Sequence, residues 1–107
     1  MPCGRAFALS IAGNTAPKLV FRVHAVARMC ERRITEEEVR RTLEGGETIE
    51  HYPDDTPYPS LLMLGWVAER PIHVVAADNR KDDEIIVITV YEPDPVLWEP
   101  GFKKRKP

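Results

Sequence analysis

Residues 61–77 read LLMLGWVAERPIHVVAA and residues 85–91 read IIVITVY, so three apolar runs follow one another in the second half of the chain. Apolar runs of this length between polar turns are typical of buried strands. A tight turn at Glu69 and Arg70 would join the first two runs, and a polar turn would lead into the third. The sequence therefore predicts strands over residues 60–68, 72–77 and 84–91.

The third run is apolar on both of its faces. Ile86, Ile88 and Val90 share one face, and the residues between them are also mostly apolar. Because alternate residues of a strand point to opposite sides of the sheet, both sides of this strand are expected to be covered. Helices would cover one side. Either a partner chain or the C-terminal segment, anchored by Trp98, would cover the other.

Two helices are expected before these strands. The second has clear boundaries, because Thr35 is suited to cap its first turn and Glu38 would complete a capping box. Glycines at positions 45 and 46 would end it. The first helix is expected over residues 24–33, and its predicted buried face consists of Ala25, Val26, Met29 and Cys30.

Short strands at residues 18–23 and 48–52 complete the pattern. This order of elements predicts an α+β fold in which two N-terminal helices pack on a three- to four-stranded, mostly antiparallel sheet. We expect residues 1–17 to be a loose N-terminal extension, residues 18–102 to be a single α+β domain, and residues 103–107 to be a basic tail.

The composition limits the classes of function. With 15 basic and 17 acidic residues in 107, the net charge is −2, which argues against strong electrostatic binding of nucleic acid by the whole surface. Cys3 and Cys30 cannot form a disulfide framework and make no Cys-x-x-Cys pair, so a reduced, cytoplasmic setting is expected. His24, His51 and His73 are not closely paired and could converge only through the fold, so we expect no metal. No cofactor is expected either. The apolar stretch 7–12 is too short to span a membrane, and no membrane partner is expected.

Several short motifs stand out between residues 21 and 102. They are His24-Ala25 with Arg28-Met29 and Arg32, GExIExYPDD at 46–55, PYPS at 57–60, PxHVV at 71–75, TVYxPD at 89–94, and Trp98. Together these motifs resemble a bacterial family filed as a domain of unknown function, DUF 4258.

The order of elements in that family is similar to that of RelE-like and BrnT-like toxins. The resemblance implies a RelE/BrnT-like fold and the toxin of a type II toxin–antitoxin pair, a metal-independent endoribonuclease that cuts messenger RNA. The implied partners are an antitoxin from the neighbouring gene, in this family a small zinc-binding protein, and RNA or the ribosome. A second copy of the chain is a further expected partner. The alternative is a non-catalytic protein-interaction domain that retains the toxin fold.

Metal-independent RNA cleavage needs a base, an acid and cations near the phosphate. His24 and Arg28 are four residues apart and would share a helical surface. Alternatively, Arg28 pairs with a carboxylate and His24 caps the helix. The candidate catalytic residues are His24, Arg28, Arg32, Tyr91 and His73.

Each of the remaining candidates also has a structural interpretation. His73 lies within an apolar run and would otherwise be a satisfied core histidine or face a second subunit. The ring of Tyr91 would otherwise cover the edge of the hydrophobic core while its hydroxyl reaches solvent. The basic tail is either a phosphate clamp or a frayed, solvated end. The candidate RNA-binding residues are Arg33, Tyr58, Lys103, Lys104 and Arg105.

Overall fold

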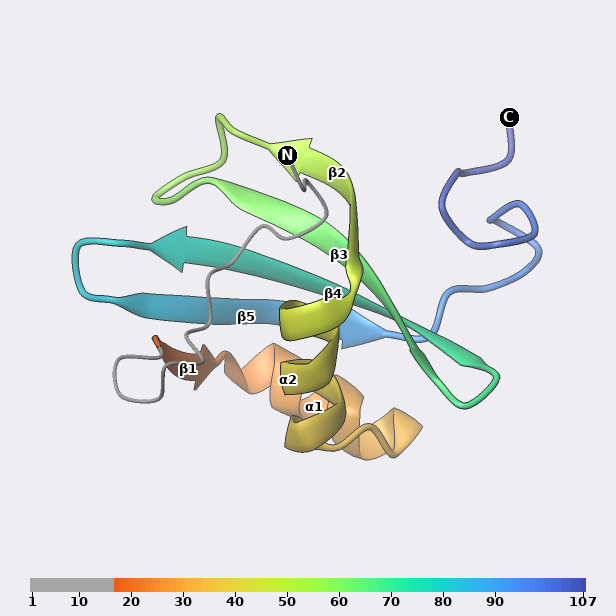
Figure 1. The fold of residues 1–107 in the computed structure, drawn as a ribbon, viewed down its shortest axis with the longest axis horizontal. Coiled ribbons are helices and arrows are strands. Elements are labelled where there is room, and N and C mark those ends of the chain that lie inside the picture. The colour runs from red at the N-terminus through yellow and green to blue at the C-terminus, as the bar shows by residue number, and fades with distance from the viewer. Residues whose placement is uncertain (1–16) are drawn as a thin grey trace.

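The computed structural model describes residues 17–107, so the predicted N-terminal extension lies, apart from Pro17, outside the described residues. Two helices lie on one side of a twisted sheet (Figure 1). The elements in chain order are β1 (Lys18–Phe21), α1 (Val23–Arg32), α2 (Glu36–Gly45), β2 (Glu47–Tyr52), β3 (Ser60–Val67), β4 (Arg70–Asn79) and β5 (Glu84–Tyr91).

The sheet has five strands in the order β1-β5-β4-β3-β2, and it is mixed. Strand β1 pairs in parallel with β5, whereas all other neighbours are antiparallel. The expectation of two N-terminal helices on a three- to four-stranded, mostly antiparallel, RelE/BrnT-like sheet is therefore wrong, although the class is α+β. A parallel pair needs a long crossover connection, and the local sequence pattern of β1 carries no information about a partner at the other end of the chain.

The predicted strands 60–68, 72–77 and 84–91 correspond to β3, β4 and β5. The turn between β3 and β4 lies at Ala68 and Glu69, one residue earlier than expected, and Ala68 adopts a φ of 58° there. Strand β4 consequently begins at Arg70 and is longer than predicted. The side chain of Arg70 donates hydrogen bonds to the carbonyls of Arg32 and Arg33, at 3.0 and 3.1 Å, and so ties the junction between the helices to the sheet.

The capping prediction for α2 is confirmed. The Thr35 hydroxyl accepts a hydrogen bond from the Glu38 amide at 3.1 Å, and the Thr35 amide donates to the Glu38 carboxylate at 3.0 Å. These two bonds satisfy amides that a helix start leaves without partners. The helix ends at Gly45 with Gly46 as its cap, as the two glycines predict.

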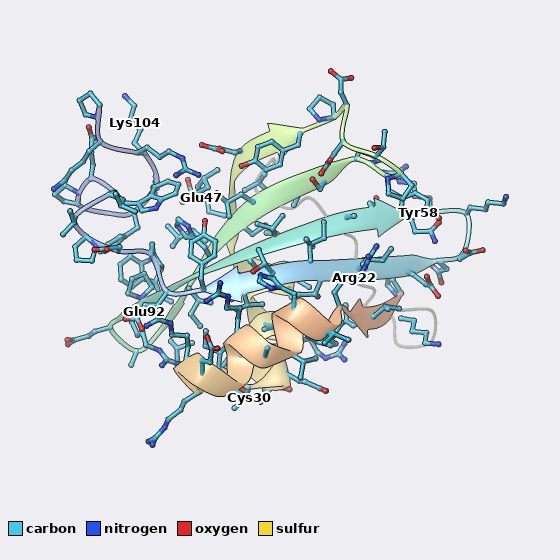
Figure 2. All side chains as sticks on the ribbon, turned by 180° about the vertical axis from the view of Figure 1, so that it is seen from behind. Arg22, Cys30, Glu47, Tyr58, Glu92 and Lys104 are labelled. Atoms are coloured by element: carbon cyan, nitrogen blue, oxygen red, sulfur yellow. The ribbon has the colours of Figure 1, made fainter. Side chains whose placement is uncertain are left out.

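The main core lies between the helices and the sheet. In α1 only Ala25 and Met29 face the sheet, because residues four apart share one side of a helix. The prediction that Val26 and Cys30 belong to the buried face is wrong, since both are exposed; Cys30 lies on the outer side of α1 (Figure 2). The fully enclosed members of this core include Ala25, Val39, Leu43, Ile72, Val74 and Val87.

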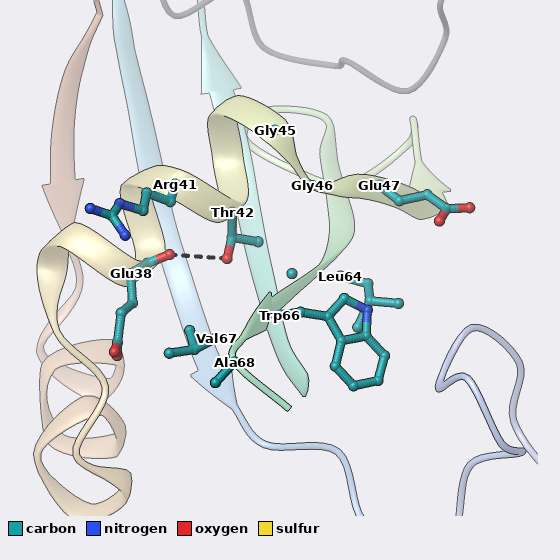
Figure 3. Close-up of a pocket in the computed structure, with 11 residues that line it drawn as sticks. Glu38, Arg41, Thr42, Gly45, Gly46, Glu47, Leu64, Trp66, Val67 and Ala68 are labelled. Carbon is teal, nitrogen blue, oxygen red and sulfur yellow. Dashed lines mark hydrogen bonds between the residues drawn. The ribbon is translucent and has the colours of Figure 1, made fainter. Parts of the chain in front are cut away.

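Helix α2 packs closely against β3 where the strand carries a glycine. A Cβ atom at Gly65 would collide with the side chain of Thr42, which itself donates a hydrogen bond to the Glu38 carbonyl at 3.0 Å (Figure 3). The absence of a side chain at Gly65 therefore sets the distance between α2 and the sheet.

Gly65→Ala is expected to lower the free energy of unfolding by about 1–3 kcal/mol, because the added methyl overpacks this contact. Urea unfolding followed by circular dichroism would measure the change. Gly45→Ala is the matched control, since nothing lies within 4 Å of a Cβ at that helical position. Equal unfolding midpoints for the two variants would contradict the close packing of α2 on β3.

Candidate active site on the open face of the sheet

The side of the sheet opposite the helices is called the open face here. The strand register places Leu64, His73 and Tyr91 side by side on it, on β3, β4 and β5. The C-terminal segment, residues 93–107, folds back over this end of the sheet. Its Trp98 is 3% exposed and packs edge-on against His73, with ring centroids 4.5 Å apart. The prediction that Trp98 anchors the tail is confirmed.

His73 is completely buried, and both of its ring nitrogens have partners. Nε2 lies 2.9 Å from the carbonyl oxygen of Phe102, and Nδ1 lies 3.2 Å from the Tyr91 hydroxyl. A carbonyl can only accept, so Nε2 carries the proton and donates it. Burial lowers the pKa of His73 and keeps the ring neutral, so Nδ1 accepts the hydrogen bond from Tyr91. The carbonyl, the imidazole and the hydroxyl thus form a chain.

Strand β2 contributes a second polar pair to the open face. Glu50 and Tyr52 lie opposite Leu62 and Ser60 of β3, and the Tyr52 hydroxyl donates a short hydrogen bond to the Glu50 carboxylate. Burial, together with this carboxylate, raises the pKa of Tyr52 to about 12. Burial also raises the pKa of Tyr91. Both tyrosines are therefore protonated at neutral pH.

Arg105 brings a positive charge to the same place. Its guanidinium carbon lies 4.7 Å from the ring centroid of Trp98, a cation–π geometry that fixes the exposed side chain. The charge of Arg105 lowers the pKa of all three titratable rings. At His73 it adds to the larger effect of burial, whereas at Tyr52 and Tyr91 it opposes the larger effect of burial. Lys103 beside it pairs with Glu47 at 3.1 Å.

These residues form what we call the open-face cluster: Glu50, Tyr52, His73, Tyr91 and Arg105. Among the described residues, the three side chains whose pKa clearly departs from its ordinary value all belong to this cluster. Displaced pKa values gather at functional sites, because catalysis needs groups whose proton affinity is adjusted to the reaction. The cluster combines a proton acceptor (His73), two protonated hydroxyls (Tyr52 and Tyr91) and a cation (Arg105). These are the kinds of group that acid–base chemistry on a phosphate requires.

The structure brings together only some of the residues predicted from sequence. His73, Tyr91 and Arg105 meet in the open-face cluster. The remaining catalytic candidates and Arg33 are exposed on α1 or just after it, on the helix side of the sheet, where Arg28 forms an ion pair with Glu31 at 3.4 Å. The residues that lie away from the cluster on that side are His24, Arg28, Arg32 and Arg33.

The candidate RNA-binding residues divide in the same way. Tyr58, in the proline-rich loop between β2 and β3, and Lys104, in the C-terminal segment, lie at opposite ends of the molecule (Figure 2). Lys103 and Lys104 immediately precede Arg105 in sequence and therefore stay near the cluster. Tyr58 is half-buried at the far end of the sheet.

Glu50 and Tyr52 were not predicted as site residues. The usable signal is their spacing of two within a strand, which places both on one face, next to the sequence PDD. Because β2 is a short edge strand, its polar residues are otherwise typical of a solvated edge.

Two cavities border these elements. The first, of about 580 Å³, lies between α2 and β3 and is lined by Glu38, Arg41, Thr42 and Trp66 among others (Figure 3). Its cation, Arg41, already pairs with Glu37 at 3.2 Å, and no histidine, cysteine or tyrosine lines it. The second, of about 520 Å³, lies on the open face next to Tyr52. Only the second is lined by a residue of the open-face cluster, Tyr52.

Within residues 17–107, no group of three or more histidine, cysteine, aspartate or glutamate side chains is arranged to hold a metal ion. The helices of the same part of the chain are too short to cross a membrane.

A family model described as "Domain of unknown function (DUF4258)" matches residues 21–92. This span includes four of the five residues of the open-face cluster and ends before Arg105. No curated protein matches the chain, and no solved structure matches it.

Proposed function

The chain belongs to the family described as "Domain of unknown function (DUF4258)", and from this premise we propose that it is a metal-independent messenger RNA endoribonuclease, the toxin of a bacterial type II toxin–antitoxin pair. The observation that carries the proposal is the convergence of the open-face cluster, in which a buried neutral histidine, two protonated tyrosines and an arginine meet. The proposal includes a cytoplasmic location, where messenger RNA is found, and an antitoxin encoded by the neighbouring gene.

In the proposed reaction, the 2′-hydroxyl of one nucleotide attacks the adjacent phosphorus and the bond to the 5′-oxygen breaks. Tyr91 accepts the 2′-hydroxyl proton while passing its own proton to Nδ1 of His73, a transfer that the existing hydrogen bond favours. Tyr52 donates a proton to the departing 5′-oxygen. The products are a 2′,3′-cyclic phosphate and a 5′-hydroxyl. The buried His73 then returns its proton through the Tyr91 hydroxyl to solvent, and Tyr52 takes up a proton from solvent.

Arg105 supplies the charge that this reaction requires. The pentacoordinate phosphorane carries an additional negative charge, which a guanidinium held beside the reacting hydroxyls would stabilise. Trp98 holds the guanidinium from one side, so little side-chain freedom is lost when RNA binds. Because the chain has a net charge of −2, binding of RNA would depend on this local patch and weaken with added salt.

The full chain incubated with RNA in the presence of EDTA is expected to produce 5′-hydroxyl and 2′,3′-cyclic phosphate ends at an undiminished rate. Arg105→Ala is expected to lower the rate about 100-fold, the usual effect of removing one charge-stabilising group. Arg41→Ala, which removes an exposed arginine on the helix side, serves as the control. End-labelled RNA resolved on gels would measure both rates. Cleavage that EDTA abolishes, or no cleavage of free or ribosome-bound RNA, would contradict the proposal.

A second candidate function is a non-catalytic protein-interaction domain. It is favoured by the aromatic pair that Trp66, which is 52% exposed, forms with the half-buried Phe102, with their ring centroids 6.0 Å apart. A domain of this kind would bind its partner unchanged when Tyr91 loses its hydroxyl, and it would cut no RNA. Partner capture and RNA cleavage, measured with the same Tyr91→Phe protein, therefore separate the two functions.

A further inference from the structure

The cavity beside Tyr52 has the composition of a site for a flat, polar-edged ligand. Val75 of β4 and Ile88 of β5 form an apolar floor, and Tyr52 forms a wall that the open-face cluster shares. Its volume of about 520 Å³ falls within the range of small-molecule sites. The rest of the lining comes from the start of the β2–β3 loop and from Ser60.

The two carboxylates at the rim of this cavity differ in their bonding. Asp55 is committed to the loop, because one of its oxygens accepts from the Thr56 amide at 3.1 Å and the other from the Ser60 hydroxyl at 2.6 Å. Asp54 is exposed and accepts no side-chain hydrogen bond from residues 17–107. The rim therefore offers a fixed acceptor, Asp55, and an available one, Asp54, beside an aromatic ring.

We propose that this cavity binds one unstacked guanine base of RNA, with the base against the Tyr52 ring and its N1–H and 2-amino groups donating to the Asp54 carboxylate. An ionised carboxylate only accepts hydrogen bonds. On the edge that normally pairs with another base, guanine presents two adjacent donors, whereas adenine, cytosine and uracil place an acceptor next to their donor. That acceptor would face a carboxylate oxygen without a hydrogen between them. Single-stranded RNA is recognised in general by such stacking and edge contacts.

This inference rests on the proposed function, because Tyr52 belongs to both the cavity and the open-face cluster. A guanine held against Tyr52 would place its neighbouring phosphate toward Arg105 and Tyr91. The cavity would then make cleavage selective for sites next to a guanine.

The test uses single-stranded DNA pentamers with guanine, hypoxanthine or adenine at the central position, which the protein cannot cut because they lack the 2′-hydroxyl. Fluorescence anisotropy with the full chain would measure their affinities. We expect guanine to bind about tenfold tighter than adenine, the usual effect of hydrogen bonds to a charged acceptor. Hypoxanthine, which lacks the 2-amino group, should bind with an intermediate affinity.

Asp54→Asn is expected to reduce the advantage of guanine over adenine to less than about twofold, since the amide adds donors where the carboxylate only accepts. Glu69→Gln, which removes one charge at the opposite end of β3, is the matched control and should retain the full advantage. Equal binding of all pentamers to the unmodified chain, no binding of any, or an unchanged preference in Asp54→Asn would overturn the guanine site. Guanine preference without cleavage of any RNA would instead overturn only the catalytic proposal.

Discussion

Tyr91→Phe is expected to slow RNA cleavage about 100-fold or more, the usual effect of removing a positioned acid–base group. In the unmodified protein the Tyr91 hydroxyl lies 3.2 Å from Nδ1 of His73, and it is the only described partner of that nitrogen. Phenylalanine preserves the ring, which packs edge-on against His73 at a centroid distance of 5.2 Å. Affinity for RNA should therefore change little, and the loss should fall on the rate constant measured at saturating enzyme.

A hydroxyl on the other side of the same sheet provides the control for this variant. Thr48 of β2 lies opposite Met63, which faces the helices, and its hydroxyl is buried without a hydrogen-bond partner among the described residues. Thr48→Val removes that hydroxyl with little change in shape, so cleavage should continue at the normal rate. If Tyr91→Phe cleaves RNA as fast as Thr48→Val, Tyr91 is not in the proton path.

His73→Ala is expected to lower the free energy of unfolding by about 3 kcal/mol at pH 7.5, as is usual when a large buried side chain is truncated. The ring is fully enclosed and contacts both Trp98 and Tyr91. Its removal leaves a cavity and deprives the Phe102 carbonyl of its donor, a loss that adds to the cost. Urea unfolding would measure the change, and His51→Ala, an exposed histidine on β2, should change stability by less than about 0.5 kcal/mol.

The same residue makes stability depend on pH in a definite direction. Burial lowers the pKa of His73 in the folded chain, so below a pH of about 6.5 the unfolded chain binds a proton that the folded chain resists. The stabilisation is complete above that pH and is lost as the pH falls toward the folded pKa, with a slope of up to about 1.4 kcal/mol per pH unit. Repeating the unfolding at pH 5.5 should therefore narrow the gap between the unmodified chain and His73→Ala. A gap that stays constant between pH 7.5 and 5.5 would show that His73 is not held neutral by its surroundings.

Local sequence patterns predicted the elements that local interactions form. The capping box of Thr35 and Glu38 lies within one helical turn, and the apolar runs of β3 to β5 pair through short turns. The parallel pairing of β1 with β5 is different, because no residue of β1 records which strand will lie beside it. That pairing is where the predicted sheet failed.

The site was predictable only where a polar residue interrupts an apolar pattern. His73 and Tyr91 do so, and they proved to be hydrogen-bonded to each other. Glu50 and Tyr52 lie on an edge strand in which polar residues are ordinary, so their role depends on neighbours that only the fold provides. The spacing of His24 and Arg28 correctly implies a shared helical surface, but that surface lies on the helix side of the sheet, away from the open-face cluster.

The parallel pairing of β1 with β5 also bears on the route by which the chain folds. The hairpins β3–β4 and β4–β5 close over short turns, whereas β1 must find β5 across most of the described chain. Contacts between distant segments form late, because closing the long loop between them costs conformational entropy before the contacts contribute any stabilising free energy. Until β1 arrives, one edge of β5 has unpaired amides and carbonyls that another molecule's strand can occupy. Refolding from denaturant therefore favours the monomer at low protein concentration, where a chain meets its own β1 before it meets a neighbour.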